Sequence, residues 1–429
     1  MKKKYFKTTV YLTYILIAIG FNSLIYSSIS NKAKDLKGLS PYLSVVSCIL
    51  FADGIGRHAI ELIDMLNGHL NMNFISSRGK TGVNLQDVPK SVKKTIKKSN
   101  KLPGKVTLFM DVLSVKKTIF AKNLPNSTVK LAYSVFETTA LPPLWKVLLN
   151  QQFDAVIVPD STLEEMYKNS GVKIPIFVLP LNLYIEELLA KSVKLKANKP
   201  FTFGMSASFI SRKNHSLLLD AFIEEFGNSS KVMLKLHGRS GEYSIVKALQ
   251  HRIATSKCSN IELLESSFSK KEYINFMASL DCYAFISKGE GFSITPREAL
   301  ALGIPCIISN NSAHKTICNT GFVYSVETPI AEPANYPILN GTFGYYFSPS
   351  LSDVRKALRD VYKNYKYWHE KALEGREWVK QYLAENLRLK YLSLLQPKKI
   401  ILGDKNIVHD NYLMTNSEAF YRKCLNLNV

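Results

Sequence analysis

Residues 281–309 read DCYAFISKGEGFSITPREALALGIPCIIS, and this stretch decides the fold. Its apolar beginning, Cys282 to Ile286, predicts a buried parallel strand, and Ile304 to Ser309 predicts a second one. Between them a glycine-rich loop leads into a helix, with Thr295 as the expected N-cap and Pro296 as the first helical residue. Strand, loop, helix and strand together form a βαβ unit, the repeating unit of a doubly wound sheet.

The loop and the start of that helix also predict a phosphate-binding site, because free backbone N–H groups and the positive end of the helix dipole meet there. Two carboxylates, Glu290 and Glu298, flank this position with seven residues between them. A phosphate attached to a sugar would offer hydroxyls for these carboxylates to bind. Two simpler readings stay open: Glu298 closes a capping box on the N–H of Thr295, and Glu290 is a solvated loop residue.

Glu-x7-Glu within GEGFSITPREALALGIP resembles the retaining glycosyltransferases of family 4. These enzymes have the GT-B fold, an α/β fold in which two Rossmann-like, doubly wound domains face an interdomain cleft. The resemblance implies that Glu290 faces the donor sugar and that Glu298 holds the ribose hydroxyls. It also implies that the diphosphate is bound by the amides of Gly291, Phe292, Ser293 and Ile294.

The activity implied is the transfer of a sugar from a nucleoside-diphosphate-sugar to an acceptor hydroxyl, in glycan, polysaccharide or glycolipid synthesis. The acceptor would be a glycan, a lipid or a protein. The sugar would be a hexose, and the configuration at its anomeric carbon would be retained. No cofactor is expected besides the nucleotide-sugar co-substrate, and no metal, since the chain has no apparent Asp-x-Asp site.

The composition is compatible with this activity. The chain has 429 residues, enough for two domains, and 46% of them are hydrophobic, too many for a disordered chain. A net charge of +22 favours anionic partners such as nucleotides or phospholipid surfaces, and no nucleic-acid-binding signature accompanies it. The six cysteines are scattered without a CxxC pair, so neither a disulfide framework nor a zinc site is expected.

Two segments suggest membrane association. Residues 8–31 carry no charge and are apolar from Val10 to Tyr26, which fits a membrane anchor or a signal peptide. We expect an anchor with the catalytic domain facing the cytoplasm, where nucleotide sugars are found. Residues 89–101 hold six lysines around Val92 and Ile96 and predict a helix that docks on anionic lipid headgroups, a solvated helix or loop being the alternative.

Alternating strands and helical stretches, with the family resemblance, predict the division of the chain. The expected parts are an N-terminal anchor or signal (1–38), an N-terminal Rossmann-like acceptor domain (39–190), a lysine-rich linker (191–200), a C-terminal Rossmann-like donor domain (201–365), crossover helices that return to the first domain (366–396) and a tail (397–429).

The segment DGIGRHA, Asp53 to Ala59, follows a predicted strand and opens a helix. In the family a glycine loop here reaches the donor diphosphate, which implies that role for Gly54 and Gly56. Gly-x-Gly-x-x-Ala also matches the dinucleotide fingerprint, so an NADP-dependent oxidoreductase stays open, with Arg78 as a partner for the 2′-phosphate. A plain strand-to-helix turn is the third reading.

The segment MSASFISRKNHSLLLDAF, residues 205–222, resembles the family's phosphate-binding strand, loop and helix. Lys213 matches the family's lysine, but Ser208 stands where its arginine is expected, so Arg212 is the expected replacement. Together these cations would offset the charge that grows on a leaving diphosphate without a metal. We therefore expect Glu290, Arg212 and Lys213 to be catalytic and Ser208 to contact the donor.

Residues 130–180 also resemble the family's first domain, through FETT, LPP and VPDS. Glu137 of FETT and His58 are candidates for contacts to the acceptor or the sugar. The usual Pro-x-Gly-Val-Asp is absent, since the chain reads PLNLY from Pro180 to Tyr184. This departure, with Ser208, leaves a non-catalytic nucleotide-sugar-binding protein as another open reading.

Overall fold

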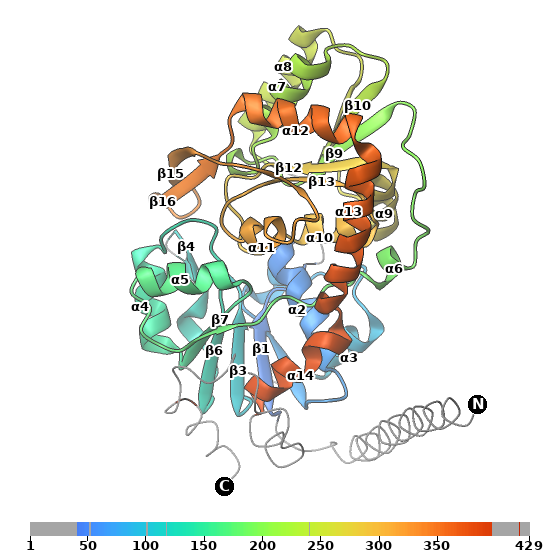
Figure 1. The fold of residues 1–429 in the computed structure, drawn as a ribbon. Helices are drawn as coiled ribbons and strands as arrows, with labels where there is room; N and C mark the ends of the chain where they lie inside the picture. The colour runs from blue at the N-terminus through green and yellow to red at the C-terminus, as the bar shows by residue number, and fades with distance from the viewer. Residues whose placement is uncertain are drawn as a thin grey trace, which may run out of the picture.

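The structure, a computed structural model, describes residues 41–50, 53–99, 102–116, 118–239, 241–396 and 420. It contains two parallel six-stranded sheets flanked by helices and set one above the other (Figure 1). The predicted α/β fold with two Rossmann-like domains is therefore confirmed. The expected anchor or signal (1–38) and, apart from Phe420, the tail (397–429) lie outside the described residues. In the described part of the chain, no helix has both the length and the apolar character needed to cross a membrane.

The first sheet has the strand order β2-β1-β3-β6-β7-β8, so the order reverses between β1 and β3. Its strands are β1 (Leu43–Ser47), β2 (Met72–Ser76), β3 (Val106–Met110), β6 (Val129–Tyr133), β7 (Ala155–Val158) and β8 (Ile176–Val178). Its helices are α2 (Gly54–Leu66), α3 (Lys90–Lys98), α4 (Pro143–Gln152) and α5 (Ser161–Asn169), and a short ribbon of β4 (Ser114–Val115) and β5 (Thr118–Ile119) follows β3.

The second sheet has the order β11-β10-β9-β12-β13-β14 and reverses between β9 and β12. Its strands are β9 (Phe201–Ser206), β10 (Val232–Gly238), β11 (Ile261–Glu265), β12 (Cys282–Phe285), β13 (Cys306–Ser309) and β14 (Tyr324–Val326). Its helices are α7 (His215–Phe226), α8 (Tyr243–Ser256), α9 (Lys270–Ser279), α10 (Ile294–Ala301) and α11 (His314–Cys318), with α6 (Glu186–Leu189) ahead of the linker.

An antiparallel hairpin that the sequence did not predict follows the second sheet. Its strands are β15 (Ile330–Tyr336) and β16 (Gly341–Ser348). The hairpin reaches the first domain, where Tyr345 N donates to Thr139 Oγ1 at 3.0 Å and the Tyr336 ring stacks on Phe136 with centroids 4.9 Å apart. It therefore closes one end of the space between the domains.

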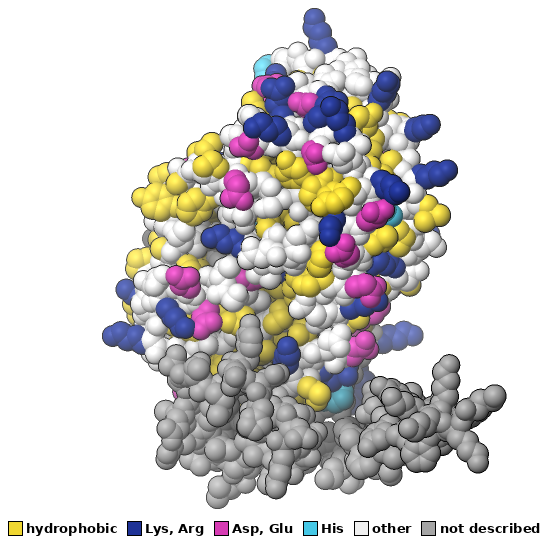
Figure 2. Space-filling view, in the orientation of Figure 1, with side chains coloured by type: hydrophobic (Ala, Val, Ile, Leu, Met, Phe, Trp, Pro, Cys, Tyr) yellow, Lys and Arg dark blue, Asp and Glu magenta, His cyan; other side chains and the backbone are white. Residues whose placement is uncertain are grey.

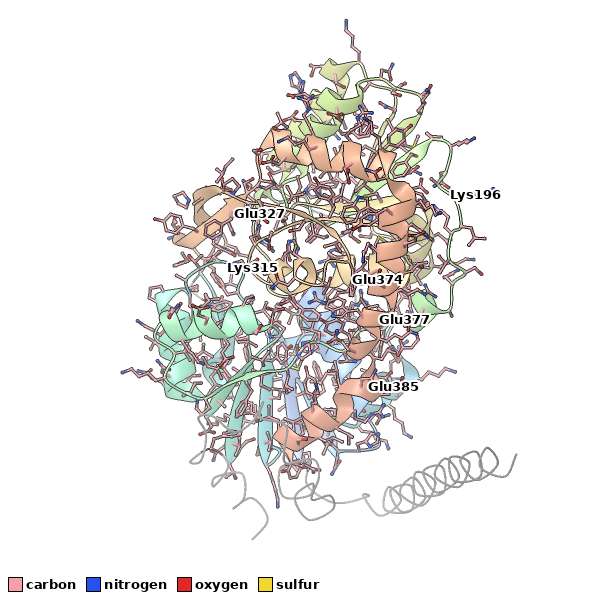
Figure 3. The ribbon with its side chains drawn as sticks, viewed as in Figure 1. Lys196, Lys315, Glu327, Glu374, Glu377 and Glu385 are labelled. Atoms are coloured by element: carbon pink, nitrogen blue, oxygen red, sulfur yellow. The ribbon has the colours of Figure 1, made fainter. Side chains whose placement is uncertain are left out.

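The last helices return the chain to the first domain. They are α12 (Leu351–Lys363), α13 (Tyr365–Trp378) and α14 (Ala384–Leu395). Figure 3 labels Glu374, Glu377 and Glu385 along α13 and α14, and they mark the path from one domain to the other. At its end, Arg388 Nε donates to the Met65 carbonyl at 3.0 Å, so α14 packs on α2.

The lysine-rich helix α3 has its apolar face against the first domain and most of its lysines exposed to solvent. Val92 is fully buried and Ile96 packs against the same core, so the apolar face is already covered by the first domain. Lys94 and Lys97 are exposed. Any contact of this helix with an anionic surface would therefore be made by its lysines alone.

Gly56 has a packing role that differs from the predicted contact with a diphosphate. A Cβ atom at this position would lie 2.6 Å from the backbone N and O of Leu50. At Gly54, in contrast, a Cβ atom would meet nothing within 4 Å. Gly56 lets the first turn of α2 approach the chain that leaves β1, and Gly54 is free of that constraint.

Replacing these glycines by alanine tests that distinction. Gly56→Ala should lower the free energy of unfolding by about 1–3 kcal/mol, because the backbone must shift to admit the methyl group. Gly54→Ala, the matched control, should stay within about 0.5 kcal/mol of the wild type. Urea denaturation of both variants measures the difference. Equal stabilities would contradict the packing role.

Candidate functional site

A cleft of about 630 Å³ lies between the domains. It is lined by residues that follow β1, β3 and β6 of the first sheet and β9, β10 and β12 of the second. Doubly wound sheets bind ligands at these carboxyl ends, where the strand order reverses. The predicted site residues that line the cleft are Gly54, His58, Glu137, Ser208, Arg212, Lys213, Glu290, Gly291, Phe292, Ser293, Ile294 and Glu298. Gly56 is not among them.

The carboxylate of Glu290 lies at the centre of a buried charge cluster. Its Oε1 accepts from Arg212 Nη1 at 2.9 Å, from Lys213 Nζ at 2.5 Å and from Ser287 Oγ at 2.7 Å. Burial acts to raise the pKa of Glu290, but Lys213 and Arg212 outweigh it and lower this pKa to about 2. Glu290 is therefore ionised at neutral pH and is a poor proton acceptor, suited to accepting hydrogen bonds.

The cations of the cluster are shared with the first domain. Arg212 Nη2 lies 3.1 Å from Glu137 Oε1, and the Tyr336 hydroxyl donates to Glu137 Oε2 at 2.9 Å. Burial and the neighbouring Arg212 lower the pKa of Lys213. Glu137, which the sequence offered as an acceptor or sugar contact, thus holds a cation of the second domain in this structure.

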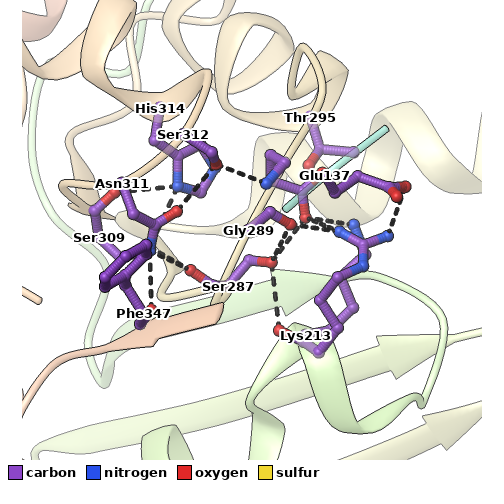
Figure 4. A network of polar contacts seen from close by, with 12 residues as sticks. Glu137, Lys213, Ser287, Gly289, Thr295, Ser309, Asn311, Ser312, His314 and Phe347 are labelled. Atoms are coloured by element: carbon purple, nitrogen blue, oxygen red, sulfur yellow. Dashed lines mark hydrogen bonds and ion pairs between the residues drawn. The ribbon is translucent and has the colours of Figure 1, made fainter. Parts of the chain in front are cut away.

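A second set of hydrogen bonds fixes the loop that carries Glu290 (Figure 4). The Glu290 N–H donates to Ser312 Oγ at 2.7 Å, and Ser312 in turn donates to Asn311 Oδ1 at 3.0 Å. The Asn311 amide donates to the carbonyls of Ser287 and Phe347, at 2.9 and 3.0 Å. Because the loop is bonded to the segment before α11, which is itself bonded to the hairpin, the carboxylate is held in place before any ligand arrives.

Glu298 does not close a capping box. Helix α10 begins at Ile294 with Ser293 as its N-cap, so the expected N-cap at Thr295 was wrong. The carboxylate of Glu298 accepts from the Tyr273 hydroxyl at 2.6 Å and from Arg57 Nη2 at 2.7 Å. Arg57 belongs to α2, so this pair joins the two domains across the cleft.

Arg57 holds a second carboxylate, that of Glu61, at 2.8 Å from its Nε. Glu61 is fully buried, and burial raises its pKa to about 7 despite the guanidinium. Two carboxylates therefore share one cation at the end of the cleft where α2 meets α10. Nothing in the local sequence pattern pointed to Arg57 or to Tyr273 as part of the site.

The two helix N-termini that face the cleft differ in whether their amides are free. At α2 the Asp53 carboxylate caps the helix by accepting from the N–H groups of Ile55 and Gly56, at 2.8 and 3.3 Å. At α10 the N-cap Ser293 makes no side-chain capping bond, and its buried hydroxyl has no partner among the described residues. The N-terminus of α10 therefore has amides that no side chain caps, whereas at α2 the Gly56 amide is already bonded to Asp53. The diphosphate role expected of Gly54 and Gly56 stays a prediction.

Arg297 supports the loop that precedes α10. Its side chain is fully buried, with the guanidinium carbon 3.9 Å from the Phe292 ring centroid and 4.8 Å from that of Tyr382. It donates to the carbonyls of Phe292 and Ser293, the latter at 2.9 Å. The crossover segment that holds Tyr382 is thereby connected to the start of α10.

Residues at the first-sheet side of the cleft are already paired. Arg78 holds Asp111 with Nε at 2.8 Å from Oδ2 and Nη2 at 2.5 Å from Oδ1, so it is engaged elsewhere than at a 2′-phosphate. Asp111 follows a predicted strand directly, and that position could have marked it as a cleft residue.

Burial lowers the pKa of His58 to about 3, and its ring packs 4.3 Å from that of Tyr133. His58 is thus a neutral residue of the cleft wall.

Comparison with known proteins agrees with this geometry. Residues 188–332, which include Arg212, Lys213, Glu290 and Glu298, match the family model described as Glycosyl transferases group 1. No curated protein matches the chain.

Solved structures with low sequence identity share the fold. HepE of Anabaena in complex with UDP and glucose has 12% identity and a TM-score of 0.58, covering 83% of this chain and 100% of that one. A glycosyltransferase from Rickettsia africae ESF-5 has 15% identity and a TM-score of 0.59, covering 85% and 100%. WaaG, a glycosyltransferase involved in lipopolysaccharide biosynthesis, has 12% identity and a TM-score of 0.57, covering 82% and 99%. The arrangement of the two domains is thus that of GT-B glycosyltransferases.

The depressed pKa of Glu290 predicts a pH dependence of stability. A carboxyl whose pKa is lowered by folding, here from 4.5 to about 2, stabilises the native state above pH 4.5 and loses that contribution as the pH falls towards 2. The shift corresponds to about 3 kcal/mol. The difference in unfolding free energy between wild type and Glu290→Gln should therefore be constant from pH 5 to 7 and shrink below pH 4.5. A difference that stays constant down to pH 3 would contradict the ion cluster.

Proposed function

We propose that the protein is a glycosyltransferase that moves a sugar from a nucleoside-diphosphate-sugar to an acceptor hydroxyl. One observation carries this proposal: two partly buried cations, Arg212 and Lys213, lie in a cleft that also holds an uncapped helix N-terminus and two carboxylates. Cations and free amides suit a diphosphate, and carboxylates suit the hydroxyls of sugar and ribose. The group 1 family match over residues 188–332 supports this reading, and the similar structure of HepE contains UDP and glucose.

Each residue can be given a role in this proposal. The amides from Gly291 to Ile294 and the side chains of Arg212 and Lys213 would hold the diphosphate. Glu290 would accept from the donor sugar with Oε2, since its three hydrogen bonds to described residues all reach Oε1. Glu298 would hold the ribose hydroxyls, because each of its oxygens accepts only one bond here and has a further lone pair.

We assign the chemistry to the retaining, metal-independent reaction of family 4. The bond between the anomeric carbon and the diphosphate oxygen breaks, and the acceptor oxygen bonds to the same face of that carbon. The acceptor proton passes to the leaving diphosphate, so no protein base is needed. What supports this is that Glu290, with a pKa of about 2, is a poor base, while Arg212 and Lys213 supply positive charge to the leaving group. The anomeric configuration of the product, read by NMR, decides between retention and inversion.

We also propose that the enzyme works at a membrane with its cleft in the cytoplasm, aided by the lysines of α3. Full-length protein should prefer anionic phosphatidylglycerol vesicles over phosphatidylcholine vesicles. Lys94→Gln with Lys97→Gln should reduce that preference about tenfold or more, at roughly 1 kcal/mol for each lysine. Lys196→Gln with Lys315→Gln, both exposed and far from α3, is the matched control (Figure 3). Equal losses in both pairs would argue against α3 as the contact.

Binding of UDP tests the donor site without knowledge of the sugar. Saturating UDP should raise the melting temperature of the wild type by several degrees, because a ligand that binds only the native state stabilises it. Lys213→Ala should weaken UDP binding at least tenfold, since it removes a partly buried cation from the proposed diphosphate site. Lys315→Ala, an exposed lysine outside the cleft, is the control and should bind UDP like the wild type. If UDP, GDP, ADP and CMP all leave the melting temperature unchanged, the proposed function is wrong.

A further inference from the structure

The end of the cleft beside the β15–β16 hairpin differs in chemistry from the centre. Side chains that line it come from β4 and the residues before it, from the segment after β6, from α4 and from the turn of the hairpin. They are Val112, Val115, Phe136, Trp145, Ile338 and Leu339. The Trp145 Nε1 bonds Ser114 at 3.1 Å, and the Phe136 ring lies between those of Trp145 and Tyr336, with centroid separations of 5.2 and 4.9 Å. These residues therefore form one continuous wall, the hairpin end of the cleft.

The polar side chains at this end are already bonded to protein partners. Asp111 accepts from Arg78 and from Ser77, the latter at 2.5 Å. The Tyr336 hydroxyl donates to Glu137. A sugar placed against the aliphatic wall would bury hydroxyls without partners, and each such hydroxyl weakens binding by about fivefold or more.

The apolar surface continues outside the cleft onto the hairpin. Ile338 at its turn is 57% exposed, and Tyr345 and Ile330 are 53% and 50% exposed. Figure 2 shows hydrophobic side chains gathered over this hairpin, at the left of the molecule. Because Ile338 both lines the cleft and faces solvent, an apolar chain could pass from the centre of the cleft to the outside along it.

We propose that the acceptor is a glycolipid or lipid-linked sugar whose hydrocarbon chain lies along the hairpin end of the cleft. The inference rests on the proposed function, since it assigns to the acceptor the end of the cleft opposite α9 and Tyr273. The hydroxyl to be glycosylated would lie near Glu137 and Glu290, where polar groups are concentrated. The apolar chain would cover Val115, Leu339 and Ile338, and its burial would supply most of the acceptor affinity.

The test compares methyl and octyl glucoside, each below its micelle-forming concentration, with UDP present. Trp145 lies in the wall, so tryptophan fluorescence reports binding there. Octyl glucoside should bind saturably and at least tenfold more tightly than methyl glucoside. Ile338→Ser should weaken octyl glucoside about fivefold or more. Ile330→Ser, an equally exposed isoleucine of the same hairpin outside the cleft lining, should bind like the wild type.

The outcomes separate this inference from the proposed function. If methyl and octyl glucoside bind alike, or if Ile338→Ser and Ile330→Ser behave alike, the inference is overturned, and UDP binding that persists in both variants leaves the transferase proposal intact. If the wild type does not bind any nucleotide, the transferase proposal fails and the assignment of this end to an acceptor fails with it.

Discussion

The ion cluster of Glu290 with Arg212 and Lys213 is the interaction on which the site depends. The residues lie 77 or 78 positions apart in the chain and meet because β9 and β12 are neighbours at the reversal of the strand order. Removing one partner from such a buried cluster typically costs about 3–5 kcal/mol, because the remaining charge is left uncompensated. The Glu290 carboxylate thus stabilises two cations in the cleft, where placing them without a negative partner would cost free energy.

The same cluster constrains how the domains approach each other. Two ion pairs cross the cleft. In one, Arg212 of the second domain contacts Glu137 of the first, and in the other, Arg57 of the first domain contacts Glu298 of the second. The hairpin adds an aromatic contact between Tyr336 and Phe136 on one side. Together these contacts position the walls of the cleft before a ligand binds, which reduces the entropy that binding must overcome.

Much of the fold could be predicted from the sequence, because buried parallel strands are continuous apolar runs. The apolar runs Cys282 to Ile286 and Ile304 to Ser309 predicted β12 and β13 to within two residues at either end. The hairpin was missed because its strands do not alternate regularly between apolar and polar residues and because β15 contains Pro333. The start of α10 was misplaced, since Ser293 adopts a left-handed φ of 66° that a serine-threonine pattern does not reveal.

The site was less predictable than the fold, since its charges act in pairs that form only in three dimensions. Local motifs identified Glu290, Lys213 and Glu298, but their partners Arg57 and Tyr273 come from helices remote in sequence. The glycine motif at residues 54–59 had the right position for a phosphate loop, yet the Asp53 carboxylate already accepts from two of its amides, those of Ile55 and Gly56. A motif shows where free amides could be, and only the neighbouring side chains decide whether they remain free.

These pairings also determine how the two parts of a nucleotide-sugar would affect the cleft. A diphosphate competes with Glu137 and Glu290 for Arg212, because a guanidinium has a limited number of donors in one plane. Hydroxyls, in contrast, can add to Glu298 without displacing Arg57, since a carboxylate oxygen accepts more than one bond. The anionic part of the ligand would therefore loosen the Glu137 contact between the domains, while the ribose would leave the Arg57 contact in place.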